Sequence, residues 1–363
     1  MPFDTHELPA KAAVGGSRQE ADRRLVATWL FAMCGLILVM ISLGGATRLT
    51  GSGLSIMEWA PLSGALPPLN ETEWQRLFAL YQKIPQYTLL NQGFGLDGFK
   101  QIFWLEWAHR LWGRLIGLAF LLPLLALAWK RAIPRAFVPR LALLFVLGGL
   151  QGAVGWFMVA SGFFPDSTAV SPYRLVVHLV LALVLYAAIL WTALSVRRPM
   201  PDLAASRGLR LLAQTTAVLV GITIVAGGFV AGLKAGLDYN SFPLMDGRLV
   251  PEGYARLQPV LRNLTENIAA VQFNHRLLAT LTSVFALATL VAGWRSGVAR
   301  GAVVALACAM AVQYALGVTT LLWMVPPGLG TAHQATAVLV LTASLVLLHR
   351  LRPARLQMEQ LPR

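Results

Sequence analysis

The chain of 363 residues is 56% hydrophobic, and only 13% of its residues are charged. Soluble domains carry about 25% charged residues, so this composition excludes an ordinary soluble protein and indicates an integral membrane protein. The formal net charge of +14 would suit a nucleic-acid binder, but the positions of the charges argue against nucleic acid as a partner. The two cysteines, Cys34 and Cys308, lie in apolar runs and support neither a disulfide framework nor a thiolate metal site.

Eight apolar runs are long enough to cross a membrane, which takes about 20 residues. They cover roughly residues 25–44, 103–129, 141–160, 174–196, 209–231, 267–293, 301–324 and 331–349. The first run has no small-residue cleavage site behind it, so we expect no cleavable signal peptide. The polar segment before it, Met1–Glu20, is expected to be disordered. The sequence therefore predicts an all-α integral membrane protein with eight transmembrane helices.

The basic residues predict the topology. Lys and Arg gather in the two tails and in the short connections that follow the second, fourth and sixth runs. Because positive loops stay in the cytoplasm, both termini should be cytoplasmic and the long connections, about 45–102 and 232–266, extracytoplasmic. In the first of these, Glu71–Lys83 has the spacing of a short amphipathic helix. We expect it to belong to a packed cap, with direct substrate contact as the alternative.

An internal repeat divides the chain into two halves. Four pairs of segments correspond: Gly44–Arg48 with Gly227–Ala231, Pro61–Leu62 with Pro243–Leu244, Gln151–Gly155 with Gln313–Gly317, and His109–Leu111 with His275–Leu277. We predict a tail at 1–24, an N-terminal four-helix half at 25–200, a C-terminal four-helix half at 205–349 and a tail at 350–363. Since each half has an even number of spans, the two bundles should be related by a pseudo-two-fold axis along the membrane normal.

Four of the six histidines, His109, His178, His275 and His333, fall one each on the second, fourth, sixth and eighth runs. All four of these helices run in the same direction and carry the histidine in their opening turns, near the extracytoplasmic face. Two imidazoles from two helices at one level suit the axial ligands of one heme iron in each half. A lone intramembrane histidine more often makes an interhelical hydrogen bond, but the repeated pattern favours ligands. Zinc lacks its usual Cys and carboxylate partners here, and copper stays open as a weaker alternative.

Three arginines accompany these histidines. Arg110 and Arg114 follow His109, and Arg276 follows His275. A guanidinium group forks onto carboxylates, so we expect the three to neutralise heme propionates. The alternative is that they extend to lipid phosphates at the membrane surface.

One residue distinguishes the two copies. When they are aligned on the histidine, Glu106 corresponds to Gln272. Residues i and i+3 share a helix face, so Glu106 should point toward the same iron as His109 and handle protons there. The alternative is a pair with Arg110 at i+4. The difference predicts chemistry in the first half and a permanent electron-carrying heme in the second.

The sequence resembles the heme A synthases of alphaproteobacteria and mitochondria from Leu25 to His349. The resemblance is carried by Gly44–Ser55, Trp59–Pro68, Glu106–Arg110, Phe273–Arg276 and Thr331–Gln334. It implies oxidation of the C8 methyl of heme O to a formyl group, which gives heme A, by two hydroxylations and loss of water. It also implies a heme b cofactor on His275 and His333, substrate heme O on His109 and His178, and a glutamate needed for activity, matched by Glu106.

The same resemblance implies that the protein lies in the cell inner membrane, in contact with membrane lipid. The partners it implies are heme O synthase and cytochrome oxidase assembly factors. The sequence leaves open whether the chain forms a homo-oligomer. Some bacterial members carry a cysteine pair in extracytoplasmic loops, which this chain lacks. Two other functions remain as alternatives. One is a di-heme b-type cytochrome that passes electrons from quinol, and the other is a heme transporter or chaperone.

Overall fold

The computed structural model describes residues 8–197, 201 and 204–353, and for residues 8–17 it describes only the backbone. Within these residues every regular element is a helix. Eight helices within these residues are long and apolar enough to cross a membrane. They are α1 (Leu8–Leu49), α4 (Leu96–Trp129), α5 (Val138–Ala160), α6 (Pro172–Arg197), α7 (Arg207–Gly232), α9 (Ile268–Ser296), α10 (Arg300–Leu322) and α11 (Pro327–Leu351). The predicted all-α membrane class and its eight spans are confirmed, and the chain is a multi-pass membrane protein.

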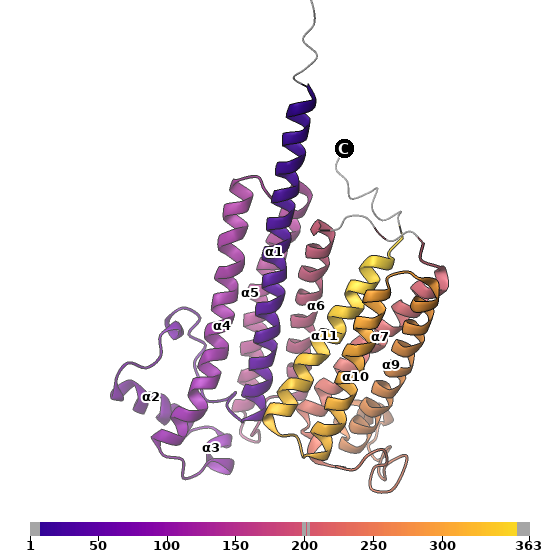
Figure 1. Ribbon diagram of the computed structural model, residues 1–363. Helices are drawn as coiled ribbons and strands as arrows, with labels where there is room; N and C mark the ends of the chain where they lie inside the picture. The colour runs from indigo at the N-terminus through magenta and orange to yellow at the C-terminus, as the bar shows by residue number, and fades with distance from the viewer. Residues whose placement is uncertain (1–7, 198–200, 202–203, 354–363) are drawn as a thin grey trace, which may run out of the picture.

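The eight long helices run up and down in one bundle, with the start of α1 and the end of α11 at the same end (Figure 1). Buried apolar side chains form one cluster mainly in α1, α4, α5 and α6, and a second cluster in α7, α9, α10 and α11. Helix α1 also packs on α11, and α6 packs on α7. Two helix groups therefore have separate cores and meet along these four helices.

Helix α1 begins earlier than the sequence suggested. The predicted disorder of Met1–Glu20 is wrong for residues 8–20, which are helical, while residues 1–7 lie outside the described residues. A helix already nucleated in the apolar run gains one hydrogen bond for each residue added, so extension is favourable. The ion pair of Glu20 with Arg24, at i and i+4, supports the same turn.

The first long connection folds into a cap on α4. It contains η1 (Ser63–Ala65), α2 (Glu71–Tyr81) and α3 (Pro85–Leu90). The predicted helix over Glu71–Lys83 is confirmed, and Asn70 caps it by accepting from the Glu73 amide at 2.9 Å. Trp74 of α2 packs its ring against Phe99 and Phe103 at the start of α4. These contacts explain why α4 begins at Leu96 rather than near 103, since its first two turns belong to the cap.

The remaining connections are short or loop-like. They contain η2 (Arg135–Phe137), η3 (Ser161–Phe163), η4 (Ala235–Leu237), η5 (Val260–Arg262) and α8 (Asn263–Glu266). Asn267 caps α9 with its side-chain oxygen, which accepts from the amides of Ala269 and Ala270 at 3.0 and 3.4 Å. This cap fixes the start of α9 about two turns before His275.

Candidate functional site

Each of the four predicted histidines packs against a glycine of the preceding long helix. The pairs are His109 with Gly44, His178 with Gly155, His275 with Gly227 and His333 with Gly317. A Cβ at the last three glycines would lie 2.9 Å from the imidazole Cε1, and a Cβ at Gly44 would lie 3.1 Å from Nε2. A side chain at any of the four positions would push the imidazole away, so the glycines let the imidazoles lie against the neighbouring backbone. The same pairing thus occurs twice in each half, in the same element order.

The second-half pair has the spacing of two ligands of one metal ion. The ring centroids of His275 and His333 are 6.5 Å apart, and the rings are nearly perpendicular at 89°. Imidazole nitrogens bind metals at about 2.0–2.1 Å, so two imidazoles on opposite sides of one ion have ring centres roughly 6–6.5 Å apart. The observed separation fits that arrangement.

Hydrogen bonds orient the imidazole of His275. Its Nδ1 lies 3.1 Å from the carbonyl oxygen of Thr223. A carbonyl can only accept, so Nδ1 carries the proton and Nε2 keeps its lone pair, the form in which histidine binds metals. His333 has a buried Nδ1 with no hydrogen-bond partner among the described atoms. A buried nitrogen in this state suits a site that a ligand completes.

Two glutamines at equivalent positions of α5 and α10 contact the other histidines. The Gln151 amide donates to the carbonyl of His178 at 2.7 Å and lies 3.1 Å from its Nδ1. The Gln313 amide lies 3.4 Å from Nε2 of His333. Both side-chain oxygens are buried without a partner in the described part of the chain. The repeat had aligned these glutamines without giving them a role, because it does not show which helices are neighbours.

The donor set in each half fits a heme. Within the described residues, no three His, Cys, Asp or Glu side chains converge as a metal site. Two imidazoles per half would supply the axial ligands of a heme iron, and a porphyrin supplies the other four ligands itself.

The twin arginines Arg110 and Arg276 bind the loop that follows the first helix of their half. Arg110 donates to the carbonyls of Ile56 and Glu58 at 2.7 Å each. Arg276 donates to the carbonyls of Tyr239 and Ser241 at 2.5 and 2.9 Å. In each half the two carbonyls belong to residues two positions apart. The main observed role of both guanidinium groups is therefore to hold a loop against the helix that carries the histidine.

Arg114 repeats this arrangement one turn further along α4. It donates to the carbonyls of Ala60 and Pro61 at 2.8 and 2.9 Å. Its Nη1 is buried without a partner within the described residues, as is Nε of Arg276. These two nitrogens are buried donors that remain available to an anionic group.

Glu106 binds the same loop, and the bonds that the structure shows for it do not include His109. Its Oε2 accepts from the amides of Ser55 and Ile56 at 2.7 and 3.0 Å and from the Ser55 hydroxyl at 2.7 Å. Its Oε1 accepts from Arg110 at 2.7 and 3.1 Å, which is the i+4 pair considered as the alternative. Five donors surround the two oxygens, the environment of an acceptor-only carboxylate.

The corresponding loop in the second half presents the opposite polarity to Gln272. The Gln272 amide donates to the carbonyls of Ala235 and Asp238 at 2.6 Å each, and its oxygen accepts from Arg276 at 2.8 Å. A carboxylate there would face two carbonyls, and an amide nitrogen at position 106 would face two N–H groups. The conformation of each loop therefore explains why position 106 carries a carboxylate and position 272 carries an amide.

Aromatic side chains lie beside the first histidine pair. Trp59 of the loop stacks on Trp156 of α5, with ring centroids 6.5 Å apart and planes 9° apart. The Arg110 guanidinium lies 5.5 Å from the centre of the Trp156 ring. Trp156 follows Gly155, the glycine behind His178. The loop held by Arg110 therefore extends from α4 to α5 next to this pair.

The two halves are joined close to both sites. Gln334, which follows His333, donates to the carbonyl of Ile41 on α1 at 2.8 Å. A Cβ on Gly45 would lie 2.7 Å from the Gln334 side chain, so α1 and α11 approach closely at this point. Gly45 follows Gly44, which lies behind His109. Consecutive residues of α1 thus contact the histidine helix of each half.

Comparison with known proteins agrees with these features. The family described as cytochrome oxidase assembly protein (COX15-CtaA) matches residues 27–345. A protein named heme A synthase from Granulibacter bethesdensis is 67% identical over 93% of this chain and 90% of its own length. Proteins of the same name from Nitrosospira multiformis and Rhodospirillum centenum are 46% and 48% identical, over 96% and 95% of this chain and 98% and 93% of their own lengths. With four glycine-backed histidines inside the matched region, the chain belongs to the COX15-CtaA family of cytochrome oxidase assembly proteins.

Proposed function

We propose that this chain is a heme A synthase, which oxidises the C8 methyl of heme O to a formyl group and so makes heme A. The single observation that carries the proposal is the repeated glycine-backed histidine, two in each half, with 6.5 Å between the ring centres of His275 and His333. The name shared by relatives that are 46–67% identical supports the same reaction. The change from methyl to formyl takes two hydroxylations and loss of water.

His275 and His333 would hold heme b as the cofactor, with Arg276 beside it. The Thr223 carbonyl keeps the proton of His275 on Nδ1, which leaves Nε2 for the iron. Heme b bound there would supply one-electron transfer to the reaction site. Nε of Arg276 is a donor available to a propionate, because it is buried without a partner among the described residues.

His109 and His178 would hold the substrate heme O in the first half. Arg110 and Arg114 would act by fixing the loop from Ile56 to Pro61 along α4, and Nη1 of Arg114 is available to a propionate. Trp59 and Trp156 would form an aromatic wall beside this pair.

For Glu106 we propose a role at the reaction site, with two possible forms that an experiment separates. The carboxylate either accepts a proton during turnover or positions Arg110 and the loop. Its five hydrogen bonds to the loop and Arg110 favour positioning.

We also propose the topology that the basic residues predict. Both termini would be cytoplasmic, the protein would lie in the cell inner membrane, and the heme sites would be near the extracytoplasmic face. The two four-helix halves, 25–200 and 205–349, would be related by a pseudo-two-fold axis. Heme O synthase would supply the substrate, and cytochrome oxidase assembly would use the product.

Identification of the bound hemes by mass tests the proposal. Purified protein should contain heme b together with heme O or heme A. Two equivalents of heme b, with no modified heme, would favour the di-heme cytochrome instead. Heme bound without any conversion of heme O to heme A in aerated, respiring membranes would favour a transporter or chaperone.

Two variants test the role of Glu106. Glu106→Gln should keep heme b but stop heme A formation under both forms. Ser55→Ala removes one donor to the carboxylate and keeps the acid, so a proton role predicts near-normal turnover, whereas a positioning role predicts weaker heme O binding. Normal heme A formation by Glu106→Gln would exclude both forms.

Replacement of His275 should abolish heme b binding, and unchanged heme b content would refute the assignment of the halves.

A further inference from the structure

The connection between α1 and α2 contains a loop without charge that exposes large apolar side chains. From Trp59 to Asn70 the chain has no Asp, Glu, Lys or Arg, and we call this segment the uncharged loop. Three of its leucines are 87%, 70% and 78% exposed: Leu62, Leu66 and Leu69. A cluster of exposed large apolar side chains indicates contact with a partner.

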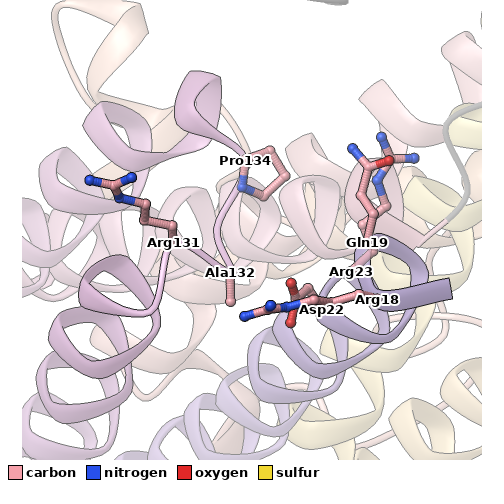
Figure 2. Close-up of a pocket in the computed structure, with 7 residues that line it drawn as sticks. All are labelled: Arg18, Gln19, Asp22, Arg23, Arg131, Ala132 and Pro134. Carbon is pink, nitrogen blue, oxygen red and sulfur yellow. The ribbon is translucent and has the colours of Figure 1, made fainter. Parts of the chain in front are cut away.

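Helix α4 gives the depth of this loop in the membrane. Figure 2 shows Arg18, Arg23 and Arg131 around the connection that follows α4, at the end of the bundle where α1 starts. Charged groups stay out of the hydrocarbon, so it begins on α4 near Trp129, which is 88% exposed. Because about 20 residues cross the hydrocarbon, its other boundary lies near residue 109 of α4.

Arg114 holds the uncharged loop inside that boundary. It is the only charged residue of α4 from Leu111 to Trp129, and it lies roughly 7 Å beyond residue 109 at about 1.5 Å per residue. Its guanidinium donates to the carbonyls of Ala60 and Pro61 at 2.8 and 2.9 Å. Figure 1 agrees, since the connection between α1 and α2 rises beside α4 above α2.

The charged neighbours of the loop stop at the boundary. Arg110, next to residue 109, donates to the carbonyl of Glu58 at 2.7 Å. The Glu58 carboxylate pairs with Arg76 of α2 at 2.8 Å. Charged side chains therefore end where the hydrocarbon starts, and the segment that continues past them along α4 has none.

The backbone of the loop is prepared for hydrocarbon, where polar groups need partners within the protein. The carbonyls of residues 60–63 all accept hydrogen bonds. Arg114 donates to the first two, and amides of the turn around η1 donate to Ala60, Leu62 and Ser63 at 3.0–3.4 Å. Three residues of the loop have no amide hydrogen that would need a partner: Pro61, Pro67 and Pro68.

The corresponding loop of the second half has the features of a loop in water. With Pro61 aligned to Pro243, the positions of Gly64 and Leu66 carry Asp246 and Arg248. With the histidines aligned, Thr280 stands in place of Arg114, so a hydroxyl replaces the guanidinium that holds the first loop along its helix. The two halves therefore differ both in the charge of the loop and in its attachment.

We propose that the uncharged loop enters the membrane leaflet opposite the chain termini, where its leucines contact lipid acyl chains. Lipid fits better than a second copy of the chain, because the loop is held at the depth of the acyl chains around α4. Its leucines continue the exposed apolar surface that Leu118 and Leu122 form on that helix. Trp59 stacks on Trp156 beside the first histidine pair, so the lipid contact extends to the edge of the candidate site. The proposal does not depend on the reaction.

Spin labels on the full chain in lipid nanodiscs test the proposal. The labels are attached at Leu62→Cys and, separately, at Leu66→Cys, with Cys34→Ala and Cys308→Ala in the background. Oxygen concentrates in hydrocarbon and a water-soluble nickel chelate is excluded from it, so the ratio of their collision rates with the label reports depth.

Both labels should give the ratio measured at Leu122→Cys, an exposed leucine of the α4 span. Leu249→Cys, an exposed leucine beside Arg248, is the matched control in water and should give a ratio several-fold lower. A ratio at positions 62 and 66 equal to that at position 249 would overturn the proposal. Low collision rates with both reagents would show that protein covers the loop, a second copy included, and would overturn it as well.

A charge in the loop gives a second test without labels. Leu62→Asp should unfold at a lower temperature than the native chain in nanodiscs, because a carboxylate is costly in hydrocarbon. The side chain of Leu62 is almost fully exposed, so lost packing within the protein does not account for such a fall. Leu249→Asp should leave the unfolding temperature unchanged. An unchanged unfolding temperature for Leu62→Asp would contradict insertion of the loop.

Discussion

A single methyl group at Gly227 should prevent binding of the heme b proposed for the second half. In the Gly227→Ala variant the new Cβ would lie 2.9 Å from Cε1 of His275, while ordinary contact begins at 3.4 Å. The ring must therefore retreat by at least about 0.5 Å, whereas metal–ligand distances vary by only about 0.2 Å in sound sites. The same movement would disturb the bond of Nδ1 to Thr223. Such overpacking typically costs about 1–3 kcal/mol.

The assay is the heme b content of the purified variant, measured by absorbance together with the spectrum that marks two imidazole ligands. We expect loss of heme b, or a spectrum in which one imidazole is missing. Gly221→Ala on the same helix is the matched control, because a Cβ there meets no described atom within 4 Å. It should keep the heme and gain up to about 1 kcal/mol in helix stability. Full heme b content with an unchanged spectrum in Gly227→Ala would refute the inference that the glycine contact positions an iron ligand.

Three further outcomes are expected. Gly45→Ala puts a Cβ 2.7 Å from the Gln334 side chain, so this variant should have a lower unfolding temperature. The double variant with Gln334→Ala should recover the native unfolding temperature. Failure of the second substitution to recover it would contradict the close contact of α1 and α11 at this point. Asn267→Ala removes the cap of α9 and should cost about 1–2 kcal/mol, seen as faster hydrogen exchange in its first turn, while Asn267→Ser should retain most protection. Hydrogen bonds from Arg76 lower the pKa of Glu58 below its usual 4.5. This pair therefore stabilises the cap above that pH and weakens as the pH falls through the lowered pKa, by less than about 1 kcal/mol because it is exposed. Tryptophan fluorescence should report the change, and Glu58→Gln should lack it.

The helices were predictable because a span in lipid must satisfy its own backbone, so apolar length alone identifies it. Their ends were not, since packing in the cap decides them. Phe99 and Phe103 extend α4 toward Trp74, and nothing in the sequence of α4 alone shows that partner. The same reason explains α1, where a polar segment is helical as the continuation of an apolar one.

The candidate site was also only partly predictable from the sequence. Repetition predicted the four histidines as candidates, because four equivalent polar residues in apolar helices are a strong pattern, and the structure shows that each packs on a glycine. Repetition also aligned the four glycines, but it could not show that they lie behind the histidines, since the pattern does not tell which helices are neighbours. Helical spacing predicted that Glu106 shares a face with His109, but the carboxylate is bonded to Ser55 and Ile56, which are about fifty residues earlier in the chain. Arg110 likewise holds the loop, which spacing along one helix cannot show.

The contact between α1 and α11 has a consequence for synthesis of the chain. Gln334 and Ile41 are separated by 293 residues, so the ribosome finishes the second partner long after the first. At about 5–20 residues per second, the interval is roughly 15–60 s. Until then Gly45 lacks its neighbour Gln334, although α1 can already pack on α4 and α6. The contact that joins the two halves beside Gly44 and His109 therefore forms only after α11 has been made.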